Sequence, residues 1–86
     1  MDPEVDSFLA LSTARLAPRT VEAYRRDLAS FATWLGASPA GATPAELAGY
    51  VAQLRADGLA ATTIARRVAA LRSFYRKQKT AYEMLP

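Results

Sequence analysis

Apolar residues recur three and four positions apart along most of the chain, and glycine and proline divide this pattern into four segments. Such spacing gives a helix one apolar stripe, whereas a half-buried strand would alternate apolar and polar residues. The dividing residues are Pro3, Pro18, the stretch 36–41, Pro44 and Gly58. The sequence therefore predicts an all-α domain with four helices and no sheet.

The first two predicted helices have clear starting signals. One begins at Pro3 with Asp2 as its N-cap, because proline lacks the N–H that stays unpaired in a first turn. Its buried side is expected to contain Val5, Phe8, Leu9 and residues from the stretch 11–16. The other covers residues 18–35 and carries an apolar stripe of Val21, Tyr24, Leu28, Phe31 and Leu35. Gly36 follows at a position suited to a left-handed cap, and Trp34 is expected to cover a core edge.

The last two helices are predicted on either side of Gly58. Thr43, Pro44 and Glu46 have the pattern of a capping box, in which the threonine and glutamate side chains satisfy each other's backbone N–H groups. The third helix then runs to Asp57, with Leu47, Tyr50, Val51 and Leu54 facing inward. The fourth runs from residue 61 or 62 to residue 79, with Ile64, Val68, Leu71, Phe74 and Tyr75 on or beside its buried stripe. Residues 80–86 are expected to form a frayed end or the start of a linker.

Charge is distributed unevenly along the chain. Residues 1–61 carry five basic and seven acidic side chains, whereas residues 62–86 carry six basic and one acidic. A basic fourth helix favours a polyanionic partner. The chain has no cysteine or histidine, so thiolate or imidazole catalysis and cysteine–histidine zinc sites are excluded, and we expect no catalytic residue, metal or cofactor. No apolar run approaches the roughly 20 residues that cross a bilayer, and no secretory signal is recognisable. We therefore expect a cytoplasmic protein.

The outward faces of the second and fourth helices are candidate binding surfaces. Helical spacing places these residues opposite the apolar stripe of the fourth helix: Thr62, Arg66, Ala70, Ser73 and Lys77. Arg72, Arg76 and Lys79 lie toward one edge of it and Arg67 toward the other. The second helix presents a similar set: Arg19, Thr20, Glu22, Ala23, Arg26 and Ser30.

The ordinary interpretation of a basic helix face is that water covers it. However, no acidic residue lies between Thr62 and Lys79, so ion pairs within the helix do not explain the charge. Ala70 and Ser73 are small enough to let another surface approach. Basic side chains with small residues between them suit a DNA groove, because Lys and Arg neutralise phosphates and Arg also reads guanine.

Residues 16–28 (LAPRTVEAYRRDL) and 59–75 (LAATTIARRVAALRSFY) resemble the two most recognisable stretches of the core-binding domain of tyrosine recombinases, the family of phage integrases, Xer recombinases and Cre. The resemblance covers about residues 4–79. It implies a compact SAM-like bundle of orthogonal helices over residues 1–79, whose second and fourth helices face the major groove of double-stranded DNA. By position it implies DNA contacts from Arg19, Thr20, Ala23, Arg26, Thr62, Thr63, Arg66, Ala70, Ser73 and Lys77. It also implies phosphate or intramolecular contacts from Arg25 and Arg72.

The same resemblance bears on activity and partners. Strand exchange in the family needs a separate catalytic domain that supplies arginine, histidine, lysine and a nucleophilic tyrosine, so this chain is not expected to be an enzyme, and Tyr82 matches no nucleophile motif. The implied partners are DNA and other recombinase protomers in a DNA-bound tetramer, the isolated domain being monomeric. Two alternatives stay open: a SAM-like protein-interaction module, which would carry more mixed charge and exposed aromatic residues, and a stand-alone helix-turn-helix regulator.

Overall fold

The computed structural model describes the backbone of residues 2–83 and the side chains of residues 2–79. Within that range there are four α-helices and a short 3₁₀ helix, and no strand: α1 (Pro3–Ser12), α2 (Pro18–Leu35), η1 (Pro39–Gly41), α3 (Pro44–Ala56) and α4 (Ala61–Glu83). The predicted all-α class is confirmed. The predicted end of α4 at Lys79 is wrong, because residues 80–83 contain no helix breaker and the helix continues to Glu83. Residues 84–86 of the expected linker lie outside the described residues.

The predicted caps account for the helix ends. The Asp2 carboxylate accepts the Glu4 N–H at 2.9 Å at the start of α1. Gly36 ends α2 with a φ of 73°, a left-handed conformation that glycine adopts without a steric penalty. The capping box of α3 is complete, with Thr43 N donating to Glu46 Oε1 at 2.9 Å and Glu46 N donating to Thr43 Oγ1 at 3.1 Å. Short-range signals in the sequence therefore set these three boundaries.

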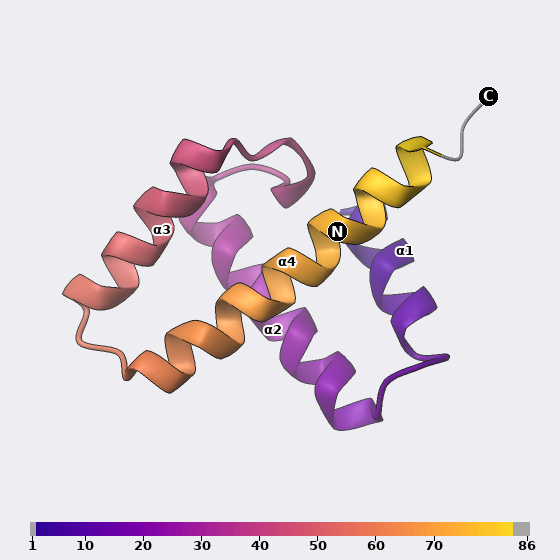
Figure 1. Cartoon of the computed structure of the whole chain (residues 1–86), viewed down its shortest axis with the longest axis horizontal. Helices are drawn as coiled ribbons and strands as arrows, with labels where there is room; N and C mark the ends of the chain where they lie inside the picture. Colours follow the sequence, from indigo (N-terminus) through magenta and orange to yellow (C-terminus); the bar gives the residue numbers. More distant parts are fainter. Residues whose placement is uncertain (1, 84–86) are drawn as a thin grey trace.

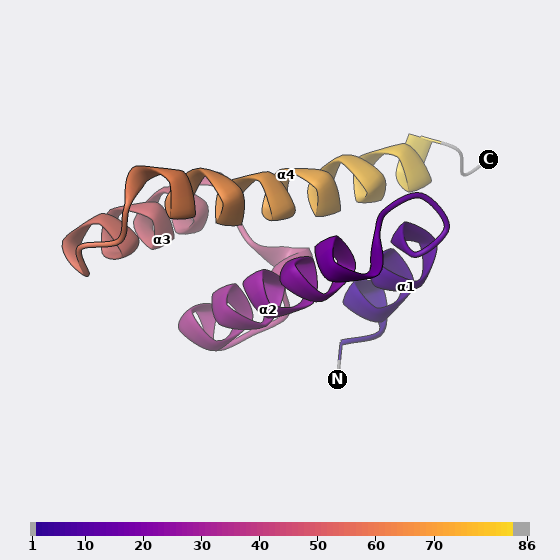
Figure 2. The ribbon, with the colours of Figure 1, turned by 90° about the horizontal axis from the view of Figure 1, so that it is seen from below.

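The longest helix, α4, crosses α2 and organises the molecule (Figure 1). α3 lies beside the N-terminal half of α4, and α1 lies near its C-terminal half. Seen from below, α4 runs above α2 and α1, and no other helix covers its upper side (Figure 2). The domain measures 42 × 28 × 21 Å. The contact between α2 and α4 at this crossing is the most extensive one between two helices of the domain.

The core lies between α2 and α4 and is completed by α1 and α3. Phe8 and Phe74 meet edge to face with ring centroids 5.4 Å apart, and Phe31 packs on Tyr50 at 4.9 Å. Trp34 covers the edge of this core, as predicted, with its ring 6.1 Å from Phe31. The buried apolar residues are Phe8, Leu9, Val21, Leu28, Phe31, Tyr50, Leu54, Ile64, Ala70, Leu71 and Phe74.

Within the stretch 11–16, Leu11 does not lie on the buried side of α1, since it is 60% exposed. Phe8, Leu9 and Ser12 occupy the inward positions instead, and helical geometry turns Leu11 away from them. The Ser12 hydroxyl donates to the Phe8 carbonyl at 2.8 Å, which satisfies this polar group inside the core.

Candidate nucleic-acid interface

An ion pair links the two helices that the sequence singled out. Arg66 Nη1 of α4 lies 2.7 Å from Asp27 Oδ2 of α2. The Asp27 side chain is 4% exposed and that of Arg66 is 49% exposed, so the carboxylate is inside and the guanidinium reaches solvent. Helical spacing identifies only ion pairs within one helix, so this pair, whose partners are 39 residues apart, could not be found from it. Arg66 is thereby held at the junction of α2 and α4.

Next to this ion pair, an open groove runs between α2 and α4. It brings together three of the predicted contact residues, Ala23, Arg26 and Arg66. Arg26 is exposed and makes no hydrogen bond or ion pair with the described residues. The other lining residues are Asp27, Ala29, Ser30, Thr33 and Arg67. Three arginines and one aspartate line the groove, which leaves it with a net positive charge.

Arg67 lines this groove, is half-buried and lies beside the core, as predicted. Its Nη1 lies 3.5 Å from the Tyr50 hydroxyl. Its Nε is buried and has no hydrogen-bond acceptor among the described residues. This guanidinium therefore connects α4 to α3 rather than standing on the open surface.

The predicted outward position of Ala70 is wrong. Ala70 is 0% exposed because α2 covers this side of α4 at the helix crossing. The small side chain allows a close approach, as the sequence suggested, but the approaching surface is α2 itself. The uncovered side of α4 is rotated toward Ala65, Ala69, Arg72 and Arg76, all of which are exposed.

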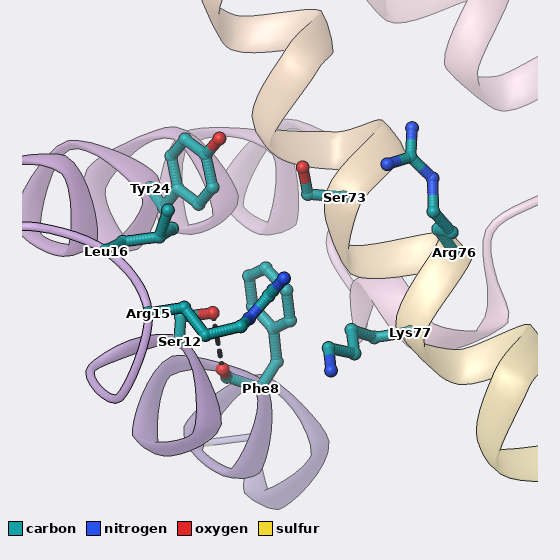
Figure 3. A pocket seen from close by; sticks show the side chains of 8 residues that line it. All are labelled: Phe8, Ser12, Arg15, Leu16, Tyr24, Ser73, Arg76 and Lys77. Atoms are coloured by element: carbon teal, nitrogen blue, oxygen red, sulfur yellow. Dashed lines mark hydrogen bonds between the residues drawn. The ribbon is translucent and has the colours of Figure 1, made fainter.

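Ser73 and Lys77 lie beyond the crossing, in a second hollow of about 310 Å³. This hollow is lined by α1, the α1–α2 loop, α2 and α4, and Phe8 and Tyr24 form part of its wall (Figure 3). Arg15 from the loop also lines it, a residue that the sequence analysis did not select because loop positions have no helical period. The face predicted to be continuous from Arg66 to Lys77 is therefore divided by the buried Ala70.

The remaining predicted residues lie at several places on the two helices. Arg19 and Thr62 are exposed in the first turns of α2 and α4, and the residues that follow them, Thr20 and Thr63, are half-buried. Arg25 is exposed, and its Nε lies 3.4 Å from Glu22 Oε2. The resemblance implied a phosphate or an intramolecular contact for Arg25, and the structure shows this intramolecular one.

Arg72 lines a third, shallow hollow on the other side of α4, together with Pro44, Leu47 and Tyr75. Burial raises the pKa of Tyr75 to about 12, and the charge of Glu46 adds to the increase. The Tyr75 hydroxyl donates to the Pro39 carbonyl and so ties α4 to η1. Tyr75 is thus a neutral hydrogen-bond donor with a structural contact.

Each of these three sites beside α4 contains a basic residue: Arg66 in the groove, Lys77 in the second hollow and Arg72 in the third hollow. Among the side chains that the structure describes, those of residues 2–79, no three acidic, histidine or cysteine side chains are grouped so that they could hold a metal ion. None of the helices in this part of the chain is long and apolar enough to span a bilayer.

The fold and the site together define a small all-helical domain with basic hollows on both sides of its central helix crossing. Residues 5–81 match the family described as "Phage integrase, N-terminal SAM-like domain", and the chain belongs to this family. The family and the SAM-like fold expected from the sequence are thereby confirmed. No solved structure gives a significant match.

Curated relatives place the family match among bacterial recombinases. The chain is 42% identical over 71 residues to tyrosine recombinase XerC of Rhizobium meliloti, with 72% of this chain and 22% of the relative covered. It is 44% identical over 62 residues to XerD of Bradyrhizobium diazoefficiens (69% and 20% covered) and 38% identical over 77 residues to XerD of Agrobacterium fabrum (84% and 23% covered). The chain thus spans only about a fifth to a quarter of the length of these relatives.

Proposed function

We propose that this domain binds double-stranded DNA as the N-terminal part of a tyrosine recombinase and grips the duplex through α2 and α4. The observation that carries the proposal is the open groove in which Arg26 and Arg66 from these two helices lie together. The relatives, which are named tyrosine recombinases, supply the biological context. In this proposal the domain positions DNA for recombination or integration and contributes no catalytic residue.

The chemistry of the groove fits a nucleic-acid backbone. Arginine side chains neutralise phosphates, and the planar guanidinium donates two parallel hydrogen bonds to one phosphate or one guanine. Arg66 carries five N–H donors and uses Nη1 on Asp27, so the remaining donors are held in a defined orientation. A donor that is already oriented loses less conformational entropy on binding than a freely rotating one. Asp27 is therefore a positioning residue in this proposal.

The proposed DNA contacts are the residues predicted from the sequence, with one exception. Ala70 is left out because it is fully buried. Thr62 and Thr63 lie in the first turn of α4, where free backbone N–H groups favour a phosphate. The other proposed DNA contacts are Arg19, Thr20, Ala23, Arg25, Arg26, Arg66, Arg72, Ser73 and Lys77.

The test is the salt dependence of duplex binding, measured by fluorescence anisotropy with a labelled duplex of arbitrary sequence. Each phosphate that the domain neutralises contributes about 0.9 to the slope of log affinity against log salt concentration. We expect binding at low salt that weakens steeply toward physiological salt. Absence of binding, or an affinity that does not change with salt, would refute the proposed function.

We further propose that other copies of the recombinase are partners in a DNA-bound tetramer, that the isolated domain is monomeric, and that it acts in the cytoplasm. The exposed Leu11 on α1 supports a protein contact on that side, since a large apolar side chain gains from burial against a neighbouring protomer. Sedimentation velocity of the isolated domain tests the proposed monomeric state: we expect a monomer without DNA, and a stable dimer without DNA would contradict it.

A further inference from the structure

The hollow beyond the helix crossing has features that the proposed groove does not use. Figure 3 shows Arg15 and Lys77 extending into it from opposite sides, Arg15 from the α1–α2 loop and Lys77 from α4, while Arg76 extends away from its centre. Arg15 and Lys77 make no hydrogen bond or ion pair with the residues that the structure describes. No carboxylate is among the lining residues. Two cations thus converge on one hollow without a counter-charge there.

We propose that this hollow is a phosphate seat, in which Arg15 and Lys77 bind a backbone phosphate of the duplex. The proposal rests on the proposed function and adds a second contact area on the far side of the helix crossing. Arg15 supplies the planar donor pair that matches phosphate oxygens, and Lys77 supplies a compact charge. The Ser73 hydroxyl lines the same hollow and offers a further donor, whereas the Ser12 hydroxyl is already engaged by the Phe8 carbonyl at 2.8 Å.

The wall of the hollow strengthens the attraction of these two cations for an anion. Phe8 and Tyr24 stack with ring centroids 6.3 Å apart and an interplanar angle of 6°, and both line the hollow. Lys77 is half-buried, so its aliphatic stem lies in the protein surface while its ammonium group faces the hollow. Electrostatic attraction is stronger beside such an apolar wall than in bulk water, because the local dielectric is lower.

The position of the hollow favours the DNA backbone over another anion. Along α4, Arg66 of the groove is separated from Ser73 and Lys77 of the hollow by seven and eleven residues, with buried Ala70 between them. At 1.5 Å per residue, this separation is about 10 to 17 Å along the helix axis. The major groove is about 12 Å wide, so its two phosphate strands have a comparable separation. A duplex whose one strand meets Arg66 can therefore place its other strand near Lys77.

Inorganic phosphate tests the seat without DNA. In a titration at constant ionic strength, the side-chain NMR signals of Arg15 Nε and Lys77 Nζ are followed, with Arg55 Nε on α3 as the reference arginine and chloride and acetate as reference anions. We expect saturable shifts of Arg15 and Lys77 with phosphate and none at Arg55. If Arg15 responds no more than Arg55 does, the phosphate assignment is overturned. Equal shifts with acetate and phosphate would also overturn it and would favour a carboxylate partner.

Duplex DNA tests the seat in its proposed role. The variant R15Q/K77Q is compared with the unmodified chain and with R55Q, and circular dichroism checks that all three are folded. We expect R15Q/K77Q to reduce the salt slope of duplex binding by about 0.9, since one phosphate contact is lost, and R55Q to leave it nearly unchanged. Salt-dependent binding with equal slopes in R15Q/K77Q and R55Q overturns the seat alone. No duplex binding by the unmodified chain overturns the proposed function, and the DNA role of the seat with it.

Discussion

Asp27 and Arg66 form an ion pair at 2.7 Å in which only the arginine reaches solvent. The two partners are therefore not equivalent. If the arginine is removed, a carboxylate stays buried without a counter-charge, whereas if the carboxylate is neutralised, a half-exposed guanidinium stays hydrated. Replacing Arg66 and replacing Asp27 should therefore lower the free energy of unfolding by different amounts.

We predict that R66Q destabilises the domain by about 3 kcal/mol and D27N by only about 1 to 2 kcal/mol. Urea unfolding followed by circular dichroism measures both values. The double variant D27N/R66Q should be more stable than the sum of the two single effects implies, because it no longer buries an unpaired charge. A larger loss in D27N than in R66Q would show that the guanidinium, and not the carboxylate, is the group that depends on its partner.

Arg26 allows a cleaner test of the groove than Arg66, because it is exposed and its replacement does not disturb the ion pair. We predict that R26Q keeps the stability of the unmodified chain and lowers the salt slope of duplex binding by about 0.9. R55Q, which removes an exposed arginine from the last turn of α3, is the matched control. Equal salt slopes in R26Q and R55Q would remove Arg26 from the contact set.

The capping box at α3 is predicted to stabilise the fold without affecting DNA binding. T43A removes the hydroxyl that accepts the Glu46 N–H, and such a loss costs about 1 kcal/mol. T33A is the control, since the Thr33 hydroxyl only bonds back to the Ala29 carbonyl within an exposed part of α2, where alanine is a good helix former. The midpoints of thermal unfolding compare the two variants. The prediction fails if T33A is as destabilised as T43A.

Tyr75 is predicted to make stability depend on alkaline pH. Its pKa in the folded chain is raised from 10.0 to about 12, so the folded state holds the phenolic proton more tightly than the unfolded chain does. The resulting stabilisation is fully present below pH 10 and is lost as the pH rises from 10 toward 12. Y75F should therefore lose less unfolding free energy over this range than the unmodified chain.

E46Q provides the comparison for this pH effect, because glutamine preserves the capping pattern and removes the charge that adds to the Tyr75 shift. Its pH dependence should lie between those of Y75F and the unmodified chain. Urea unfolding at several pH values measures all three. An identical pH dependence in Y75F and the unmodified chain would refute the role of the Tyr75 proton.

Three helix boundaries, unlike the end of α4, were predictable because the groups that set them are neighbours in the sequence. The capping box at Thr43 involves residues three positions apart, and Gly36 ends α2 with a backbone conformation that depends on that residue alone. The apolar stripe of α2 likewise predicted its buried side. Residues close together in the sequence were therefore enough to predict these helix ends and the buried side of α2.

The division of the binding surface was not predictable in this way. The helical wheel identifies the side of α4 opposite its apolar stripe, but it does not say that α2 covers Ala70. The partner of Arg66 lies 39 residues away, and its identity depends on the angle at which the helices cross. Arg15 lies in a loop without a periodic pattern. These features come from the tertiary arrangement.

α4 is one unbroken helix of 23 residues, and residues from the groove and from the second hollow project from it. Their spacing is therefore set by the helical repeat and not by the conformation of a loop. The helix thus fixes both the distance and the relative direction of these side chains. One extra residue after Ala70 would turn Lys77 by about 100° and move it by about 1.5 Å relative to Arg66. With DNA bound at both the groove and the second hollow, the domain would respond to the width of a DNA groove as well as to its charge.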